Sequence, residues 1–361
     1  MTYTYIFAFI PVAVIFALMP YLVRHDNLFG ISAPSSYYKE PAAKKMRVAF
    51  AVWTAVIALL CIALAFIATD RLGGAAGVYA GTAMLFAMLI LIGILYLIMH
   101  KKAKKIKAEL KWEERAEPVA VADTSFYTKK IAVSKLWFLV YILIIAATAA
   151  AGLVLYPDLP ANIPVHQGAQ GDISYAPKSM MTVLMMPAIQ LFIAAIFAFV
   201  YYTLKRARPE LSADAVEVTS EQNRKHRYAW SAFSVFGGML LMLLFGVIQL
   251  EMLGVVQGVS YIATIVSMVL FIGAVLALSI IFGQSGSRVK VGGADGTQTV
   301  VNRKDDKYWK MGAFYFNKND PSMFVEKRFG IGYTLNFANP LAVIVMAGIV
   351  IVVIVGIIIG R

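Results

Sequence analysis

The chain has 361 residues, of which 60% are hydrophobic and only 15% are charged, and its mean hydropathy is +0.73. A chain of this composition cannot cover itself with polar surface in water, which excludes a soluble two-domain protein and places most residues in lipid. The net charge of +13 is spread over short segments between apolar runs, which indicates a membrane surface and not a nucleic-acid interface. The single cysteine, Cys61, lies within an apolar run, so no disulfide framework is expected.

Eight apolar runs contain no Asp, Glu, Lys, Arg or His, and each is long enough to cross about 30 Å of hydrocarbon as a helix. Helices satisfy their own backbone hydrogen bonds in lipid, and no run alternates as barrel strands do. We therefore predict an all-α integral membrane protein with eight transmembrane helices, the first of them a retained span and not a cleaved signal peptide. The predicted spans are residues 3–23, 48–69, 76–99, 136–155, 180–203, 229–250, 258–281 and 340–360.

The basic residues predict how these spans are oriented. Four alternate connecting segments hold 30 of the 33 Lys and Arg residues, whereas the other segments hold only Arg71, Lys178 and Arg361. By the positive-inside bias the rich segments are cytoplasmic and both termini are extracellular. The rich segments are residues 24–47, 100–135, 204–228 and 282–339.

This alternation predicts five parts of the chain. They are residues 1–135, a three-helix region with basic cytoplasmic loops; 136–203, a two-helix module around an extracellular loop at 156–179; 204–281, two further spans; 282–339, a cytoplasmic linker and small β-rich module; and 340–361, the last span. Five lysines between 101 and 107 would each gain about 1 kcal/mol near anionic lipid, on a helix that continues the third span. The alternative interpretation is that this cluster only determines topology.

Uncharged polar residues within the spans include Gln190 and Gln249. Proton-coupled transporters usually keep ionisable groups in the membrane, and their absence from these runs counts against transport. Gly237-Gly238 is expected to let helices approach closely, and Pro187 is expected to kink its helix.

The outer loop at 156–179 carries Pro157, Pro160, Pro164 and Pro177, which restrict its backbone and make a partly rigid binding surface. His166 is a candidate for metal binding or pH response, but no acidic residue stands at a recognised ligand spacing from it. We therefore predict no metal, no cofactor and no catalytic residue. The candidate ligand-binding residues are Pro160, Pro164, His166, Gly171, Asp172 and Lys178.

The same loop resembles a widespread bacterial domain of unknown function, through Leu159-Pro160, Ile163-Pro164-x-His166, Gly171, Asp172 and Lys178. That domain also occurs in the immunity proteins for the sporulation-delay toxin of Gram-positive bacteria. The resemblance covers residues 136–203, and it departs after the histidine, where this chain has Gln167 and Gly168 instead of an aromatic residue and Asn. It implies an envelope protein that faces a peptide or small ligand, and it names no reaction.

Residues 282–339 form the longest polar segment of the chain. A Gly- and Ser-rich linker at 283–296 precedes residues with strand propensity at 313–316, 323–325 and 331–337, with a turn signal at Asn319-Asp320-Pro321. These strands are too short to fold alone, so we predict a small antiparallel unit packed on the membrane face.

Over about 305–340 the segment contains Asp306, Trp309, Gly312, Phe314-Tyr315, Asn317, Asp320-Pro321, Phe324-Val325, Lys327-Arg328, Gly330-x-Gly332 and Asn336. Through these residues it resembles a second uncharacterised bacterial domain. Gly330-x-Gly332 lacks the strand–turn–helix context of a phosphate-binding loop, so a nucleotide site is not favoured. Lys327-Arg328 either contacts lipid phosphates or marks the inner face. The candidate structural or partner-binding residues here are Trp309, Phe314, Tyr315, Asn317, Asp320, Lys327, Arg328, Gly330 and Gly332.

Three functions are compatible with these features. The first is a non-enzymatic envelope protein that confers immunity to, or senses, a peptide or lipid-linked ligand at the outer loop. The second is a transporter or flippase, which predicts a polar cavity lined by Gln190 and Gln249. The third is a membrane enzyme acting on a lipid-linked substrate, which needs His166 to converge with Asp158 or Glu251. Anionic lipids are the expected partners in each case, and nucleic acid is not.

Overall fold

The computed structural model describes residues 2–112, 126, 128–167, 173–207, 209, 211, 215–291, 306–344 and 346–347, with side chains for all of these except 2–8, Ala75, His166 and Gln167. Its long helices are α1 (Thr2–Leu22), α2 (Pro41–Leu72), α3 (Gly74–Glu109), α4 (Phe138–Leu155), α6 (Met185–Arg206), α7 (Val216–Met252) and α8 (Val259–Phe282). A single helical turn, α5 (Met180–Val183), precedes α6.

Six of the described helices, namely α2, α3, α4, α6, α7 and α8, are long and apolar enough to cross a membrane, and α1 adds a shorter apolar stretch, Phe9–Leu22. Large apolar side chains cover their outer surfaces: Leu143 is 68% exposed and Val269 is 59% exposed. Surfaces of this kind require lipid as their surroundings. A helical multi-spanning protein is thus confirmed. Residues 340–344 begin a further helix, and most of the eighth predicted span lies outside the described residues.

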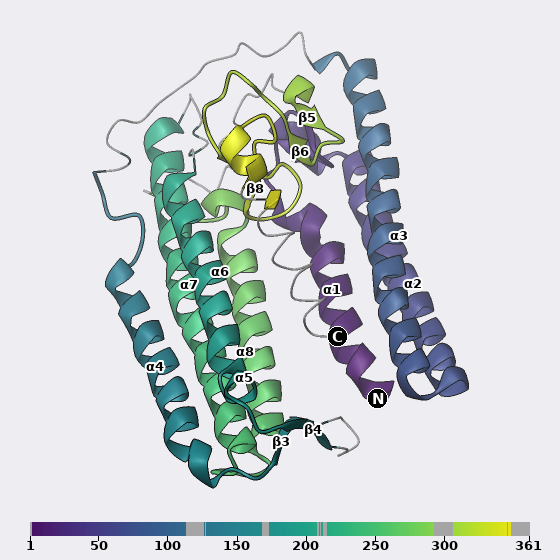
Figure 1. Cartoon of the computed structure of the whole chain (residues 1–361). Coiled ribbons are helices and arrows are strands. Elements are labelled where there is room, and N and C mark those ends of the chain that lie inside the picture. The colour runs from purple at the N-terminus through teal and green to yellow at the C-terminus, as the bar shows by residue number, and fades with distance from the viewer. Residues whose placement is uncertain are drawn as a thin grey trace.

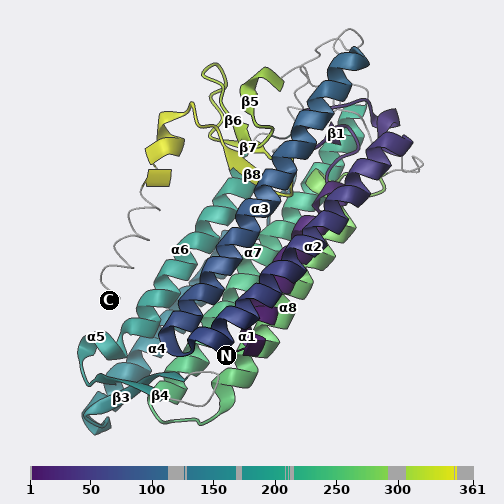
Figure 2. The same cartoon turned by 90° about the vertical axis from the view of Figure 1, so that its right-hand side faces the viewer.

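The helices form two groups, which Figure 1 shows side by side; in Figure 2 the group with α1, α2 and α3 lies in front of the other. In the first group α2 packs against both α1 and α3 around buried Phe50, Met88 and Ile92. In the second group α7 packs against α4, α6 and α8, and α1 touches α8 where the groups meet. Gly238 permits the contact between α4 and α7, because a Cβ at this position would overlap the Tyr141 hydroxyl. That hydroxyl donates to the Val235 carbonyl at 2.7 Å.

Residues 180–203 do not form the single kinked helix that we predicted, because the chain breaks at Leu184 between α5 and α6. Pro187 has no N–H to donate to the carbonyl of Val183 four residues earlier, and its ring disfavours a continuous helix there. Gln249 of α7 replaces the missing donor, since its Nε2 lies 3.0 Å from the Val183 oxygen. Gln190 is likewise buried and donates to the Met242 carbonyl at 2.8 Å. Both glutamines therefore join helices.

The segment 204–228, predicted as a loop, is helical from Val216 onward, so α7 extends well beyond its apolar run. Paired side chains at helical spacing stabilise this extension. Arg224 donates to Glu221 at 2.8 Å, and buried Arg227 donates to Asn223 at 2.6 Å.

Four two-stranded antiparallel hairpins are present among the described residues. One of them, β3 (Asn162–Gln167) with β4 (Ile173–Pro177), lies at the end of the bundle that we call the hairpin end (Figure 1). The other three lie at the opposite end, which we call the basic end because the described parts of the Lys- and Arg-rich segments lie there. They are β1 (Asn27–Leu28) with β2 (Ile31–Ser32), β5 (Trp309–Lys310) with β6 (Phe314–Tyr315), and β7 (Phe324–Glu326) with β8 (Tyr333–Leu335). The small β-rich unit predicted in 282–339 is thereby confirmed, with β5 as an additional strand.

Candidate functional site

The hairpin β3–β4 occupies the predicted outer loop. Its register shifts between Pro164 and His166, which leaves one extra residue in β3 as a bulge. Ile163 is fully buried and packs with Val183 and Met252, so the hairpin is anchored to the bundle. Pro160 is exposed and Pro164 is half-buried. The side chain of His166, together with Gly171 and Asp172, lies outside the described residues.

Lys178 closes the base of this hairpin. Its ammonium donates to the carbonyl oxygens of Pro157 and Leu159, each at 2.9 Å, and lies 5.1 Å from the ring of Tyr156. Two of the three ammonium donors are therefore occupied by the loop itself. Lys178 positions the hairpin, with one donor remaining for any ligand.

A cleft of about 460 Å³ separates the hairpin from the turn between α7 and α8, with Pro164, Val165 and Ile173 on the hairpin side. Glu251 lies on the other side, where its carboxylate accepts hydrogen bonds from the backbone N–H of Gly258 at 3.2 Å and of Ser260 at 2.7 Å. This carboxylate therefore caps the first turn of α8 and satisfies donors that the helix leaves open.

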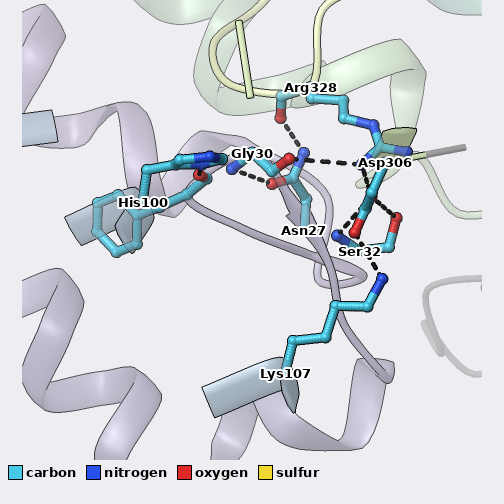
Figure 3. Close-up of polar contacts among 8 residues, drawn as sticks. Asn27, Gly30, Ser32, His100, Lys107, Asp306 and Arg328 are labelled. Atoms are coloured by element: carbon cyan, nitrogen blue, oxygen red, sulfur yellow. Dashed lines mark hydrogen bonds and ion pairs between the residues drawn. The ribbon is translucent and has the colours of Figure 1, made fainter. Parts of the chain in front are cut away.

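At the basic end, Asp306 connects the C-terminal module to the first helix group (Figure 3). Its carboxylate accepts from the Ser32 hydroxyl at 2.9 Å, from the Lys107 ammonium at 2.6 Å and from the Arg328 guanidinium. Asn27 of β1 also donates to the Arg328 carbonyl. Burial alone would raise the pKa of Asp306, but Arg328 and Lys107 together hold that pKa below its usual value of 3.8.

Two glycines allow the module to approach α3 and the β1–β2 turn. Gly30 has a φ of +83° and Gly312 a φ of +68°, and a Cβ at Gly30 would lie 2.7 Å from the Cα of Gly312. Tyr96 donates to the Met311 carbonyl at 3.1 Å, and the His100 Nδ1 lies 2.8 Å from the Phe29 carbonyl. The β1–β2 turn and the β5–β6 turn therefore contact each other, and both pack against α3.

The remaining predicted residues of the module mostly stabilise it. The Tyr315 hydroxyl donates to Asp320 at 3.0 Å and accepts from Asn317 at 3.0 Å. Buried Trp309 lies under the Arg328 guanidinium at 5.2 Å, whereas Phe314 is 50% exposed.

The turn from Lys327 to Gly332 joins two antiparallel strands, so Gly330 and Gly332 serve a hairpin and not a phosphate-binding loop. Both glycines have φ values near +97°, a conformation that other residues adopt at a cost. Arg328 is 1% exposed and paired with Asp306, which excludes it from contact with lipid phosphates. Lys327 instead lines a cavity described below.

Sequence reasoning missed the residues His226 and Trp230, which face that same cavity. They stand at the junction of a polar segment and an apolar run, where the composition gave no periodic signal. The spacing of Asn223 and Arg227, four residues apart, could have indicated that the helix extends through this junction.

Family models match two short parts of the chain. Residues 143–191 match a domain of unknown function (DUF1648), and residues 318–343 match a family of unknown function (DUF5808). The first match contains the β3–β4 hairpin and the second contains β7 and β8. Both matches fall on the segments that resemble uncharacterised bacterial domains, so each of these segments is similar to a family of unknown function. No curated protein and no solved structure gives a significant match to the chain.

Proposed function

We propose that this protein is a non-enzymatic bacterial plasma-membrane protein with eight transmembrane helices, and that it confers immunity to, or senses, an extracellular peptide or lipid-linked ligand. The observation that carries the proposal is the anchored hairpin β3–β4, which presents the exposed side chains of Ile173 (45%) and Tyr175 (60%) beside the cleft at Glu251. Within the described part of the chain these two strands pair only with each other, which leaves edges that an extended peptide could join as a third strand.

The separation of charge supports an extracellular hairpin. The hairpin lies at the end of the bundle opposite the described parts of the segments rich in Lys and Arg. The positive-inside bias therefore favours an outer location for β3–β4 and an inner location for the module at 306–339. Helix α7 contacts the hairpin through Met252 and reaches the basic end at Val216, so it is the element that would relay binding inward.

The two alternative functions, a transporter or flippase and a membrane enzyme, receive less support from the structure. A transporter or flippase would place Gln190 and Gln249 along a polar passage, and both side chains are instead fully buried in contacts between helices. An enzyme would need the Glu251 carboxylate for chemistry, and backbone N–H groups of α8 already engage both of its oxygens.

The test is a challenge of bacteria with membrane-active antimicrobial peptides. A strain lacking the gene is compared with strains that express the wild-type chain or the double variant Ile173→Ser/Tyr175→Ser at equal membrane levels. The control is Tyr79→Ser on α3, which also removes a highly exposed tyrosine, 75% exposed, but outside the hairpin. We expect the wild type and the control to protect cells, and the hairpin variant to protect no better than the deletion. Equal protection by all three proteins would refute recognition by the hairpin.

A further inference from the structure

A cavity of about 590 Å³ lies at the basic end, where α1 meets α6, α7 and α8 under the β7–β8 hairpin. Most of its wall is apolar and comes from membrane helices, for example Met19 of α1, Phe199 of α6 and Leu276 of α8. Its volume falls in the range of roughly 300 to 1,000 Å³ that is typical of small-molecule sites.

Two hydrogen-bonding side chains of α7 line this cavity without protein partners. His226 is 2% exposed, and among the described residues neither of its ring nitrogens has a hydrogen-bond partner. The Trp230 indole nitrogen is also buried and lacks an acceptor within the described structure. An imidazole carries at least one N–H and an indole always carries one, so both present donors that burial makes costly to leave unsatisfied. A ligand with acceptor atoms would satisfy them.

Lys327 brings a positive charge to the same wall. No carboxylate of the described residues lies within ion-pair distance of its ammonium, and burial lowers its pKa from the usual 10.5. The neighbouring Arg328, in contrast, is neutralised by Asp306. Arg328 and Lys327 thus have different roles. Arg328 holds the module on the first helix group, whereas Lys327 faces a cavity that has apolar walls and no counter-charge among the described side chains.

We propose that this cavity binds a membrane phospholipid with an anionic headgroup. The phosphate would accept from Lys327 and, once the buried rings of α7 turn toward the cavity, from His226 and Trp230, and an acyl chain would pack along the walls from α1, α6 and α8. An amphiphile fits better than a soluble anion, because the walls are mostly apolar and continue the surface of membrane-spanning helices. The site lies at the helix ends near the basic loops, where headgroups of an anionic leaflet gather.

The experiment uses the full-length protein, purified in a neutral detergent. Thermal unfolding and native mass spectrometry are recorded with added phosphatidylglycerol, with phosphatidylcholine of the same acyl chains, or with inorganic phosphate alone. Lys327→Met removes the charge and retains the side-chain length, and removing an unpaired buried charge should leave the fold intact. Lys310→Met is the control, since Lys310 is an exposed lysine of the same module. Leu276→Trp fills the apolar part of the cavity and tests the acyl chain independently.

We expect phosphatidylglycerol to bind the wild type and Lys310→Met with equal affinity, and to bind Lys327→Met about tenfold more weakly, as expected for one lost charge-assisted hydrogen bond. Leu276→Trp should also bind it more weakly while remaining folded by circular dichroism. Equal binding of phosphatidylcholine, equal stabilisation by inorganic phosphate, or unchanged affinity in Lys327→Met would each overturn the proposal.

Discussion

Substitution of Asp306 by Asn should destabilise the protein, because it removes the counter-charge of a buried arginine. The Arg328 side chain is 1% exposed, and those of Lys107 and Asp306 are 11% and 19% exposed, so water screens this group of charges only weakly. Breaking a buried ion pair by removing one partner typically costs about 3 to 5 kcal/mol. Since Lys107 and Asp306 keep some contact with solvent, we expect a loss near the lower value, about 3 kcal/mol.

The free energy of unfolding can be measured by titrating mixed micelles with sodium dodecyl sulfate and following tryptophan fluorescence. The matched control is Glu109→Gln, which breaks the pair between Lys105 and Glu109, whose side chains are 80% and 59% exposed. An exposed pair contributes less than about 1 kcal/mol. The double variant Asp306→Asn/Arg328→Met should recover part of the loss, because the most deeply buried cation is then removed together with its counter-charge. If Asp306→Asn is no more destabilising than Glu109→Gln, the reasoning is refuted.

The destabilisation caused by Asp306→Asn should also depend on pH in a defined direction. The folded protein holds the pKa of Asp306 below 3.8, so the stability from this carboxylate is present above about pH 4 and is lost as the pH falls through the lowered pKa. The difference in melting temperature between wild type and Asp306→Asn should therefore be constant near neutrality and vanish in acid. A difference that changes between pH 6 and 8 would contradict this assignment.

Two further substitutions test other contacts, each by the same unfolding measurement. Gly312→Ala should cost about 1 to 3 kcal/mol more than Gly332→Ala, because both glycines have positive φ but only a Cβ at 312 meets the His100 ring, at 2.7 Å. Equal losses would show that backbone strain alone matters. Gln249→Leu should cost about 1 to 2 kcal/mol by leaving the Val183 carbonyl without its donor, and Thr264→Val, at an exposed hydroxyl that bonds within its own helix, should cost little. A neutral Gln249→Leu would mean that the carbonyl finds another partner.

The structure differs from the sequence-based predictions mainly at the places where helices begin and end. The break at Leu184 depends on Pro187 and on a donor from α7, 66 residues distant from the acceptor, which no local pattern reveals. The helical start of α7 at Val216 depends on Glu221, Asn223 and their partners, in a segment that composition alone describes as polar. The two-residue turn between β1 and β2 has positive φ at both Phe29 and Gly30, and Gly adopts such a conformation readily.

The sequence by itself determined that this chain forms helices long and apolar enough to cross a membrane, because long apolar runs are a property of the chain, independent of its packing. Only the tertiary structure decided what the polar residues of the two ends do. It directs Lys178 to the base of its own hairpin, joins Arg328 to Asp306 and leaves Lys327 facing an apolar cavity with His226. The physical reason is that the role of a charge depends on which partner packs within a few ångströms of it, and here those partners come from distant parts of the chain.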